Sequence, residues 1–349
     1  MDAALVIPNH NGARWLPGLL ESVAAQTVAP AEVLVVDDGS TDGSAQLAAG
    51  YDGVRVLALE GNGGFARTAN AGIAAVSAEA VALVNTDVVL APDWLERAVA
   101  ALEGERSAAA VATKLVDLEN PAVLYSAGDV LRRDGACQQR GRFERDTGRY
   151  DTPGEVFSAC AAAALYRRAA VQGAGGFDER LGTYLEDVEL GLRLRLAGWR
   201  CRWEPRAVAR HAGGGSSAAL AHGPGAWVVR NTLLLVARFF RVRWLPLVAY
   251  RQLAWAWHAA RAGRLRDHVA GVRMALPLIG PFLRERGDSA VTVEEVVPRL
   301  PIRGPRAGGH PSRHARNVSM TDSTTPAPRP RNQSSSGGRR RRARRRAPW

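Results

Sequence analysis

Short apolar runs alternate with amphipathic segments over the N-terminal part of the chain. Runs of strand length that are apolar apart from Glu32 and Arg55 occupy residues 4–8, 32–36, 54–59 and 81–84. Apolar residues recur at helical spacing over residues 15–25, 46–49, 65–77 and 92–103. This alternation predicts an α/β fold with a mainly parallel central sheet that helices flank on both faces.

Each predicted strand ends in polar or glycine-rich residues. In open α/β sheets, ligands bind beyond the carboxyl ends of the strands, so these residues form the candidate binding site. Neither a GxxxxGKS/T loop nor a GxGxxG fingerprint follows the first strand, which argues against an ATPase or a dinucleotide enzyme. The four strand ends read Pro8-Asn9-His10-Asn11, Asp37-Asp38-Gly39-Ser40, Glu60-Gly61-Asn62-Gly63-Gly64 and Asn85-Thr86-Asp87.

Asp38 and Asp87 have specific candidate roles at these ends. The Asp38 carboxylate can accept the imide N–H of a uracil or thymine ring, although its surroundings also suit a turn and helix cap. Asp87 can hold Mg²⁺ or Mn²⁺ through its oxygens, with the ion bridging a diphosphate. One carboxylate is a poor metal site alone. His211 can supply a second ligand that suits Mn²⁺ better than Mg²⁺, but a histidine in a glycine-rich segment is commonly just a surface residue.

A second group of acids precedes an apolar helical pattern, in Tyr184-Leu185-Glu186-Asp187-Val188-Glu189-Leu190. The helix dipole favours acids at a helix start, so the segment can be an ordinary one. A carboxylate held there can also take a proton as a general base. The residues by themselves leave both interpretations open.

Charge divides the chain into regions, although the formal net charge is +12. Residues 1–199 hold 17 basic and 27 acidic groups, whereas residues 200–273 hold 13 arginines and two acids. Beyond residue 300 there are 13 arginines and one acid, with almost no large apolar residue. The chain is therefore predicted to comprise an N-terminal α/β domain (1–225), an amphipathic helical segment (226–300) and a disordered Arg-rich tail (301–349).

The segment 226–300 interleaves Arg and Trp with apolar residues, and no run reaches the roughly 18 uncharged residues of a spanning helix. Such helices are typical of the membrane interface, where arginine attracts anionic headgroups. Packing on the N-terminal domain or a dimer contact is the alternative. A further apolar patch over residues 272–283 is broken by Pro277 and Pro281. The arginine run of the tail suits a polyanion, with anionic membrane favoured over nucleic acid, or is solvated without a partner.

Cysteine usage and the start of the chain bear on location. Three cysteines without a CxxC pair argue against a disulfide framework and for a reducing compartment. Residues 1–8 have no basic region, and their apolar run is too short for a signal peptide. We therefore expect a cytoplasmic protein at the inner face of the plasma membrane.

Seven motifs in order give the chain a resemblance to a known family. Over residues 4–240 it resembles the inverting family-2 glycosyltransferases of the GT-A fold, in particular their rhamnosyltransferase-like branch. The motifs are Val6-Ile7-Pro8-Asn9-His10-Asn11-Gly12, Val35-Val36-Asp37-Asp38-Gly39-Ser40-Thr41-Asp42, Asn62-Gly63-Gly64-Phe65-Ala66-Arg67 with Asn70-Ala71-Gly72, Asn85-Thr86-Asp87, Gly175-Gly176-Phe177-Asp178-Glu179, Glu186-Asp187-Val188-Glu189-Leu190, and His211 with its glycines.

The resemblance implies a role for each matched residue. Asp187 would be the catalytic base, with Glu186 as second choice. Asp87 and His211 would hold a divalent metal, Mg²⁺ or Mn²⁺; Asp87 matches the family's DxD motif, whose first acid is Asn85 here. The acceptor side would comprise Gly175, Gly176, Phe177 and Asp178. The donor side would comprise Pro8, Asn9, His10, Asp38, Asn62, Arg67, Asn70, Asn85 and Thr86, with His10 where the family usually has a stacking Tyr.

The activity that the resemblance implies is transfer of a sugar from a nucleoside-diphosphate sugar to a hydroxyl of a glycan or lipid-linked acceptor. dTDP-rhamnose is the leading donor and UDP-sugars come next. Two other classes stay open. A polyanion-binding protein would act through the Arg-rich tail. A sugar nucleotidyltransferase would carry a Gly-rich basic loop near its start, where Arg14 is the only basic residue among the first 20.

Overall fold

The computed structural model describes residues 1–213, 222–286 and 292–297. The described residues all belong to one compact unit, Met1–Leu300. The predicted tail, residues 301–349, lies outside the described residues.

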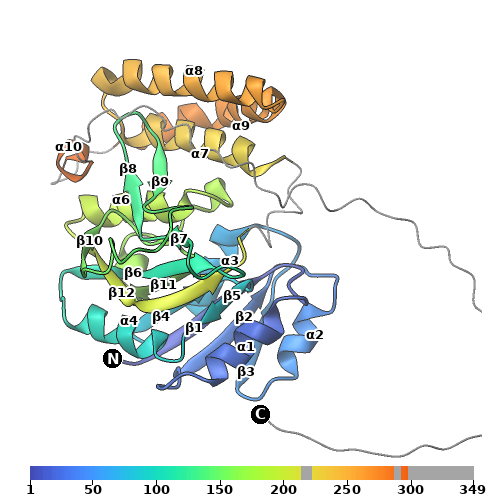
Figure 1. The fold of residues 1–349 in the computed structure, drawn as a ribbon. Helices are drawn as coiled ribbons and strands as arrows, with labels where there is room; N and C mark the ends of the chain where they lie inside the picture. Colours follow the sequence, from blue (N-terminus) through green and yellow to red (C-terminus); the bar gives the residue numbers. More distant parts are fainter. Residues whose placement is uncertain (214–221, 287–291, 298–349) are drawn as a thin grey trace, which may run out of the picture. The chain divides into compact units, whose positions relative to one another are not determined.

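A mixed β-sheet forms the centre of this unit, with strand order β10-β12-β6-β11-β4-β1-β2-β3 (Figure 1). The strands β1 to β4 pair in parallel, as predicted, whereas β11 runs antiparallel to both β4 and β6. The strands are β1 (Ala3–Asn9), β2 (Glu32–Asp37), β3 (Val54–Ala58), β4 (Ala80–Val84), β5 (Val88–Leu90), β6 (Ala108–Asp117), β7 (Leu124–Ser126), β8 (Asp129–Leu131), β9 (Cys137–Gln139), β10 (Gly154–Val156), β11 (Ala163–Arg167) and β12 (Arg200–His211).

Helices cover both faces of the sheet, which confirms the predicted fold class. Because side chains alternate along a strand, Leu5 and Ile7 of β1 enter one apolar cluster, and Ala4 and Val6 enter the other. The helices are α1 (Leu16–Ala24), α2 (Ser44–Ala49), α3 (Phe65–Ala75), α4 (Trp94–Glu103), α5 (Arg168–Gly173), α6 (Glu186–Leu196), α7 (Pro224–Phe239), α8 (Leu245–Arg261), α9 (Leu265–Arg284) and α10 (Val293–Val296), with the 3₁₀ turns η1 (Glu179–Leu181) and η3 (Val242–Trp244).

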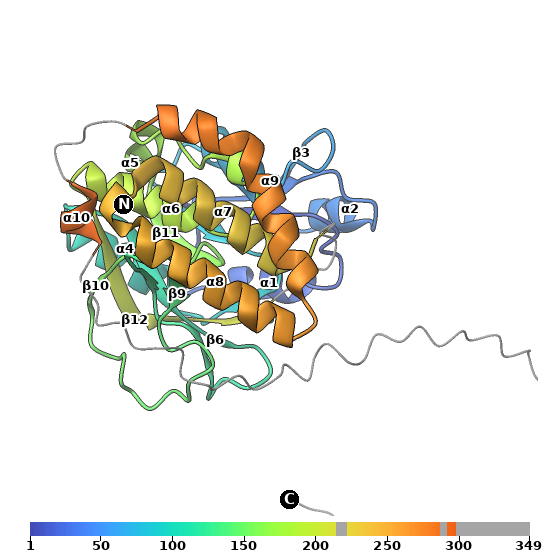
Figure 2. The same ribbon diagram turned by 90° about the horizontal axis from the view of Figure 1, so that it is seen from above.

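The helices α7, α8 and α9 form a layer over α6 and the β8–β9 hairpin (Figures 1 and 2). A third apolar cluster joins Val188 and Leu192 of α6 to Leu234 and Leu235 of α7. α8 is tied to the β8–β9 hairpin by a buried ion pair, in which Arg251 Nε lies 2.9 Å from Asp134 Oδ2. The predicted amphipathic segment therefore packs directly on the helix that carries Asp187.

The apolar patch that was predicted to be broken by Pro277 and Pro281 is instead part of one continuous helix, α9. On either side of the prolines, Ala275 and Phe282 are buried in the third apolar cluster, and this packing holds the helix through both prolines. A Cβ on Gly271 would lie 2.4 Å from the Ala226 carbonyl oxygen, so α9 crosses α7 at very close range. Within the described residues, none of the helices has the length and apolar character that crossing a membrane requires.

Candidate active site

The ends of β1 and β2 are joined by a buried amide. Asn9 Nδ2 donates to Asp37 Oδ1 at 2.6 Å and to Ser44 Oγ at 2.9 Å. Asp37 also accepts the backbone N–H of Ser40 at 3.1 Å. Asn9 therefore fixes the turn after β2, while its neighbour Pro8 lies in the parallel ladder opposite Val36.

Asp38 holds the glycine-rich loop after β3. Its buried carboxylate accepts the backbone N–H groups of Gly63 at 3.0 Å and Gly64 at 2.8 Å, and Arg67 Nη1 lies 3.9 Å away. The Asp38 carbonyl oxygen accepts a hydrogen bond from His10 Nδ1 at 2.9 Å. The structure thus gathers four predicted donor-side residues at one edge of the sheet: His10, Asp38, Asn62 and Arg67.

Strand register brings Asp87 and His211 together across 124 positions of sequence. β5 runs antiparallel to β12 and pairs Val88 with His211, which puts the preceding residue, Asp87, beside the imidazole. Asp87 Oδ1 lies 3.1 Å from His211 Nε2, and both side chains are buried. The Tyr125 ring packs edge-on against His211 at 4.3 Å between centroids.

This pair suits a divalent cation. One carboxylate and one imidazole are ligands that Mn²⁺ accepts. Among the described residues, no group of three or more His, Cys, Asp or Glu side chains is placed to hold a metal, so an ion here would take its other ligands from substrate and water. His211 Nδ1 is buried without a hydrogen-bond partner in the described part of the chain. The other ring nitrogen, Nε2, contacts Asp87.

Asp187 lies in the first turn of α6. It is half-buried, and its Oδ1 accepts the N–H of Val188 at 2.8 Å while Oδ2 accepts the N–H of Ala161 at 3.1 Å. Glu186 beside it is buried, and its Oε2 has no hydrogen-bond partner among the described residues.

A third carboxyl, Asp129 of β8, faces this pair and was not predicted from the sequence. It is buried and accepts the Ser158 hydroxyl at 3.0 Å. Burial raises the pKa of Asp129, and the charge of Asp187 raises it further. Burial likewise raises the pKa of Glu186 and of Asp187, although the two backbone N–H groups on Asp187 oppose the shift of its pKa.

One short segment connects the Asp187 end of the site with the Asp87 end. Ala161 donates its N–H to Asp187, and the carbonyl of the next residue, Ala162, accepts the N–H of Asn85 at 2.9 Å. Asn85 opens the Asn85-Thr86-Asp87 motif, and Thr86 is buried behind it. Adjacent residues of one segment therefore fix the spacing of the two acidic centres.

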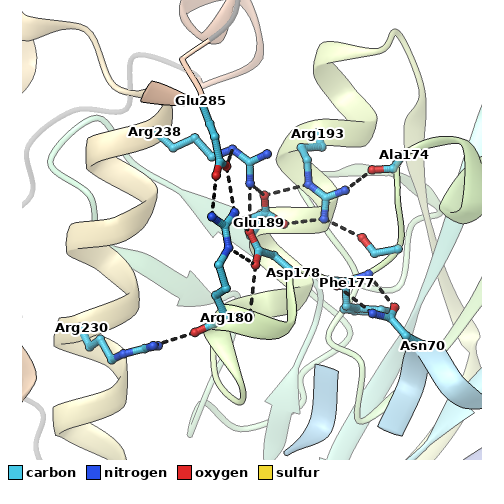
Figure 3. A network of polar contacts seen from close by, with 11 residues as sticks. Asn70, Ala174, Phe177, Asp178, Arg180, Glu189, Arg193, Arg230, Arg238 and Glu285 are labelled. Carbon is cyan, nitrogen blue, oxygen red and sulfur yellow. Dashed lines mark hydrogen bonds and ion pairs between the residues drawn. The ribbon is translucent and has the colours of Figure 1, made fainter. Parts of the chain in front are cut away.

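Asn70 and the predicted acceptor-side residues form one unit (Figure 3). Asn70 Nδ2 donates to the Phe177 carbonyl at 2.9 Å, and Asn70 Oδ1 accepts the Phe177 N–H at 2.8 Å. The Phe177 ring is buried edge-on against Phe65. Gly175 and Gly176 have φ of +84° and +73°, a conformation that glycine adopts readily, and a Cβ on Gly176 would meet Asn70 at 2.6 Å.

Asp178 and Glu189 are held by arginines from several elements (Figure 3). Glu189 is fully buried and pairs with Arg193 at 2.6 Å and with Arg238 of α7 at 2.9 Å. Arg238 also contacts Asp178 at 3.1 Å. Glu189 therefore fixes α6 to α7, and Asp178 joins the acceptor-side segment to the same ion pairs.

Comparisons with known proteins decide the family. A model described as glycosyl transferase family 2 matches residues 4–174. The chain is also 32% identical over 222 residues to N-acetylglucosaminyl-diphospho-decaprenol L-rhamnosyltransferase of Mycobacterium tuberculosis, a match that covers 56% of this chain and 71% of that relative. The chain belongs to glycosyl transferase family 2. The predicted enzyme class is thereby confirmed.

This glycosyltransferase is similar to a second relative, the pre-mycofactocin glycosyltransferase of M. tuberculosis, at 33% identity over 218 residues. That match covers 60% of the chain but only 42% of the relative, so the chain spans less than half of that protein's length. Among solved structures, GalNAc-T7 with UDP, GalNAc and Mn²⁺ aligns with a TM-score of 0.54 at 15% identity, covering 68% of this chain and 48% of that one. The predicted GT-A fold is confirmed.

The substitution Asp129→Asn is expected to stabilise the glycosyltransferase increasingly as the pH rises. The folded-state pKa of Asp129 lies above its unfolded value of about 4, so the contribution of the wild-type carboxyl to stability is complete below that pH. That contribution is lost as the pH rises through the folded-state pKa. Asparagine does not titrate and keeps an oxygen for the Ser158 hydroxyl.

The measurement is the melting temperature of Asp129→Asn minus that of the wild-type enzyme, followed from about pH 5 to pH 8. Asp52→Asn, at an exposed position, is the matched control. A difference that stays constant over this range would show that Asp129 does not titrate as the buried carboxyl described here.

Proposed function

We propose that this glycosyltransferase moves a sugar from a nucleoside-diphosphate sugar to a hydroxyl of a glycan or lipid-linked acceptor, with inversion at the anomeric carbon. The observation that carries the proposal is the shared anchoring of Asp187 and of the Asn85-Thr86-Asp87 motif on Ala161 and Ala162. A base and a diphosphate-binding group at a fixed spacing are what direct displacement requires.

Asp187 is the proposed general base. As the acceptor hydroxyl attacks the anomeric carbon, Asp187 takes its proton, the new glycosidic bond forms and the bond to the diphosphate breaks. The raised pKa of Asp187 makes its carboxylate a stronger proton acceptor than an exposed aspartate. Glu186 is the second choice, because its buried Oε2 has no partner among the described residues that would hold it for another purpose.

Asp87 and His211 are the proposed ligands of a divalent metal, Mn²⁺ or Mg²⁺. When bound, such an ion neutralises the charge that develops on the leaving diphosphate. The imidazole favours Mn²⁺, and the structurally similar GalNAc-T7 was crystallised with Mn²⁺. The Arg67 guanidinium would add positive potential on the donor side.

dTDP-rhamnose is the proposed donor, because a relative that this chain covers to 71% is an L-rhamnosyltransferase. A UDP-sugar is the second candidate, since GalNAc-T7 binds UDP. Thymine and uracil present the same imide N–H, so the Asp38 carboxylate would suit either base. The remaining donor-side residues proposed are Pro8, Asn9, His10, Asn62, Asn70, Asn85 and Thr86.

A donor screen tests this assignment. The full chain is incubated with Mn²⁺, a prenyl-diphosphate-linked sugar and one donor at a time, and nucleoside-diphosphate release is measured. We expect acceptor-dependent release from dTDP-rhamnose that exceeds release from UDP-GlcNAc, UDP-glucose and GDP-mannose. Faster release from one of these other donors would overturn the choice of sugar. Equal release from Asp87→Asn and wild-type enzyme would overturn the metal assignment.

A lipid-linked acceptor would require contact with a membrane, and α8 and α9 present a suitable surface. Their exposed large apolar residues recur at helical spacing: Tyr250, Leu253 and Trp257 on α8, and Val269, Leu276 and Leu283 on α9. Residues 245–284 also contain six arginines against a single acid, Asp267. Apolar side chains among arginines match an anionic bilayer surface, at the inner face of the plasma membrane.

The double substitution Leu253→Glu and Trp257→Glu is expected to weaken binding to vesicles of phosphatidylcholine and phosphatidylglycerol by about tenfold or more. Both side chains are largely exposed, at 71% and 62%, so folding should be unaffected. Co-sedimentation measures the bound fraction. Val28→Glu, at an exposed apolar residue outside α8 and α9, is the control. Unchanged binding by the double variant would contradict the assignment of this surface.

A further inference from the structure

The segment that leads into α6 has a strained backbone. Tyr184 and Leu185 both have φ of +66°, in the left-handed region that side chains with a Cβ disfavour. Residues persist in this conformation only where their surroundings hold them. Because Asp187 follows two residues later, the conformation of this segment sets where its carboxylate lies.

Asn231 of α7 holds this segment from the other side. It is completely buried, and its Nδ2 donates to the carbonyls of Leu181 at 3.0 Å, Thr183 at 3.0 Å and Tyr184 at 2.6 Å. A primary amide has two hydrogens, so the three carbonyls share them. One side chain therefore holds the segment at three of its carbonyls.

The neighbouring Arg230 completes the arrangement. Its Nη2 donates to the Arg180 carbonyl at 2.6 Å, a contact that Figure 3 shows, and its Nη1 lies 3.3 Å from the Leu181 carbonyl. The carbonyl of Gly182 accepts the N–H of Ala66, in the first turn of α3, at 2.9 Å. Each carbonyl from Arg180 to Tyr184 is thus bound, either by α7 or by the helix that follows the donor-side glycines.

We propose that Asn231 is a positioning residue for sugar transfer. By holding Leu181, Thr183 and Tyr184, it keeps the left-handed segment in place and so fixes Asp187 relative to the donor-side loop. This rests on the proposed function, in which Asp187 is the base. A catalytic carboxylate must be placed to within a fraction of an ångström, and the hydrogen bonds that place it act from outside the site.

The test compares Asn231→Ala with Asn231→Ala/Leu185→Gly. In the single variant, kcat is expected to fall about 10²-fold while the KM for the nucleotide sugar stays near the wild-type value. Glycine adopts a positive φ without strain, so the added Leu185→Gly should recover at least part of the lost kcat. A purely structural role for Asn231 predicts no such recovery, since Leu185→Gly removes packing as well.

Val236→Ala, at a buried position five residues further along α7, is the matched control. It should lower the melting temperature and leave kcat unchanged. If Asn231→Ala does not fold, Asn231→Ser, which keeps one donor, takes its place with a smaller expected loss of kcat. Wild-type kcat in a folded Asn231 variant, or no recovery with Leu185→Gly, would overturn the proposal.

Measuring Asp187→Asn in the same assay separates this proposal from the proposed function. If Asp187→Asn retains wild-type turnover, the assignment of the base fails whatever the Asn231 variants do. If Asp187→Asn is inactive and the Asn231 variants are fully active, only the positioning role fails.

Discussion

Asp187→Asn is expected to reduce sugar transfer by about 10³-fold, because an amide cannot take the proton of the acceptor hydroxyl. Asparagine has the same shape, and its Oδ1 can still accept one of the two backbone N–H groups that hold Asp187. The geometry of the first turn of α6 should therefore persist. The measurement is the initial rate of nucleoside-diphosphate release, with nucleotide affinity determined separately by calorimetry.

Nucleotide affinity is the internal control for this variant, since Asp38, Arg67 and Asp87 on the donor side are untouched. Glu186→Gln is the second control and should retain most of the rate. Substantial turnover by Asp187→Asn, combined with loss of turnover in Glu186→Gln, would transfer the role of base to Glu186.

Glu189→Gln is expected to lower the free energy of unfolding by about 3 kcal/mol. Glu189 is fully buried between Arg193 and Arg238, and removing its charge leaves two guanidinium groups facing each other without their common partner. The variant keeps the volume of the side chain but removes its charge and one of the two oxygens that accept from the arginines. Denaturant unfolding at constant pH measures it.

Asp93→Asn is the matched control for this prediction. Asp93 and Arg97 form an ion pair with the same i,i+4 spacing and the same 2.6 Å separation, but at the start of α4, where both side chains are more than a third exposed. Its loss should change the free energy of unfolding by no more than about 0.5 kcal/mol. Equal effects of the two substitutions would mean that burial and the contact with α7 add nothing to the Glu189 pairs.

The parallel half of the sheet could be predicted because each of its strands is a separate apolar run bounded by polar residues. β1 to β4 end within two residues of their predicted ends. The antiparallel strand β11 could not be predicted in this way. Its sequence continues an alanine-rich stretch without β-branched residues, which suits a helix as well as a strand. Pairing with β4 and β6 decides its structure.

Some residues of the site could likewise be predicted from the sequence, and others could not. Asp38 and Asp87 stand out in sequence because each follows an apolar strand. Asn231 and Asp129 do not, because no motif or strand end marks either residue in the sequence, and the role of each depends on partners distant in sequence.

The anomeric configuration of the product tests the central claim most directly. The full chain is supplied with dTDP-rhamnose, or the donor that the screen selects, and the configuration of the transferred sugar is determined by NMR. Displacement assisted by a single base, Asp187, predicts a configuration opposite to that of the donor. A product that retains the donor's configuration would contradict this mechanism and the roles of the residues assigned to it.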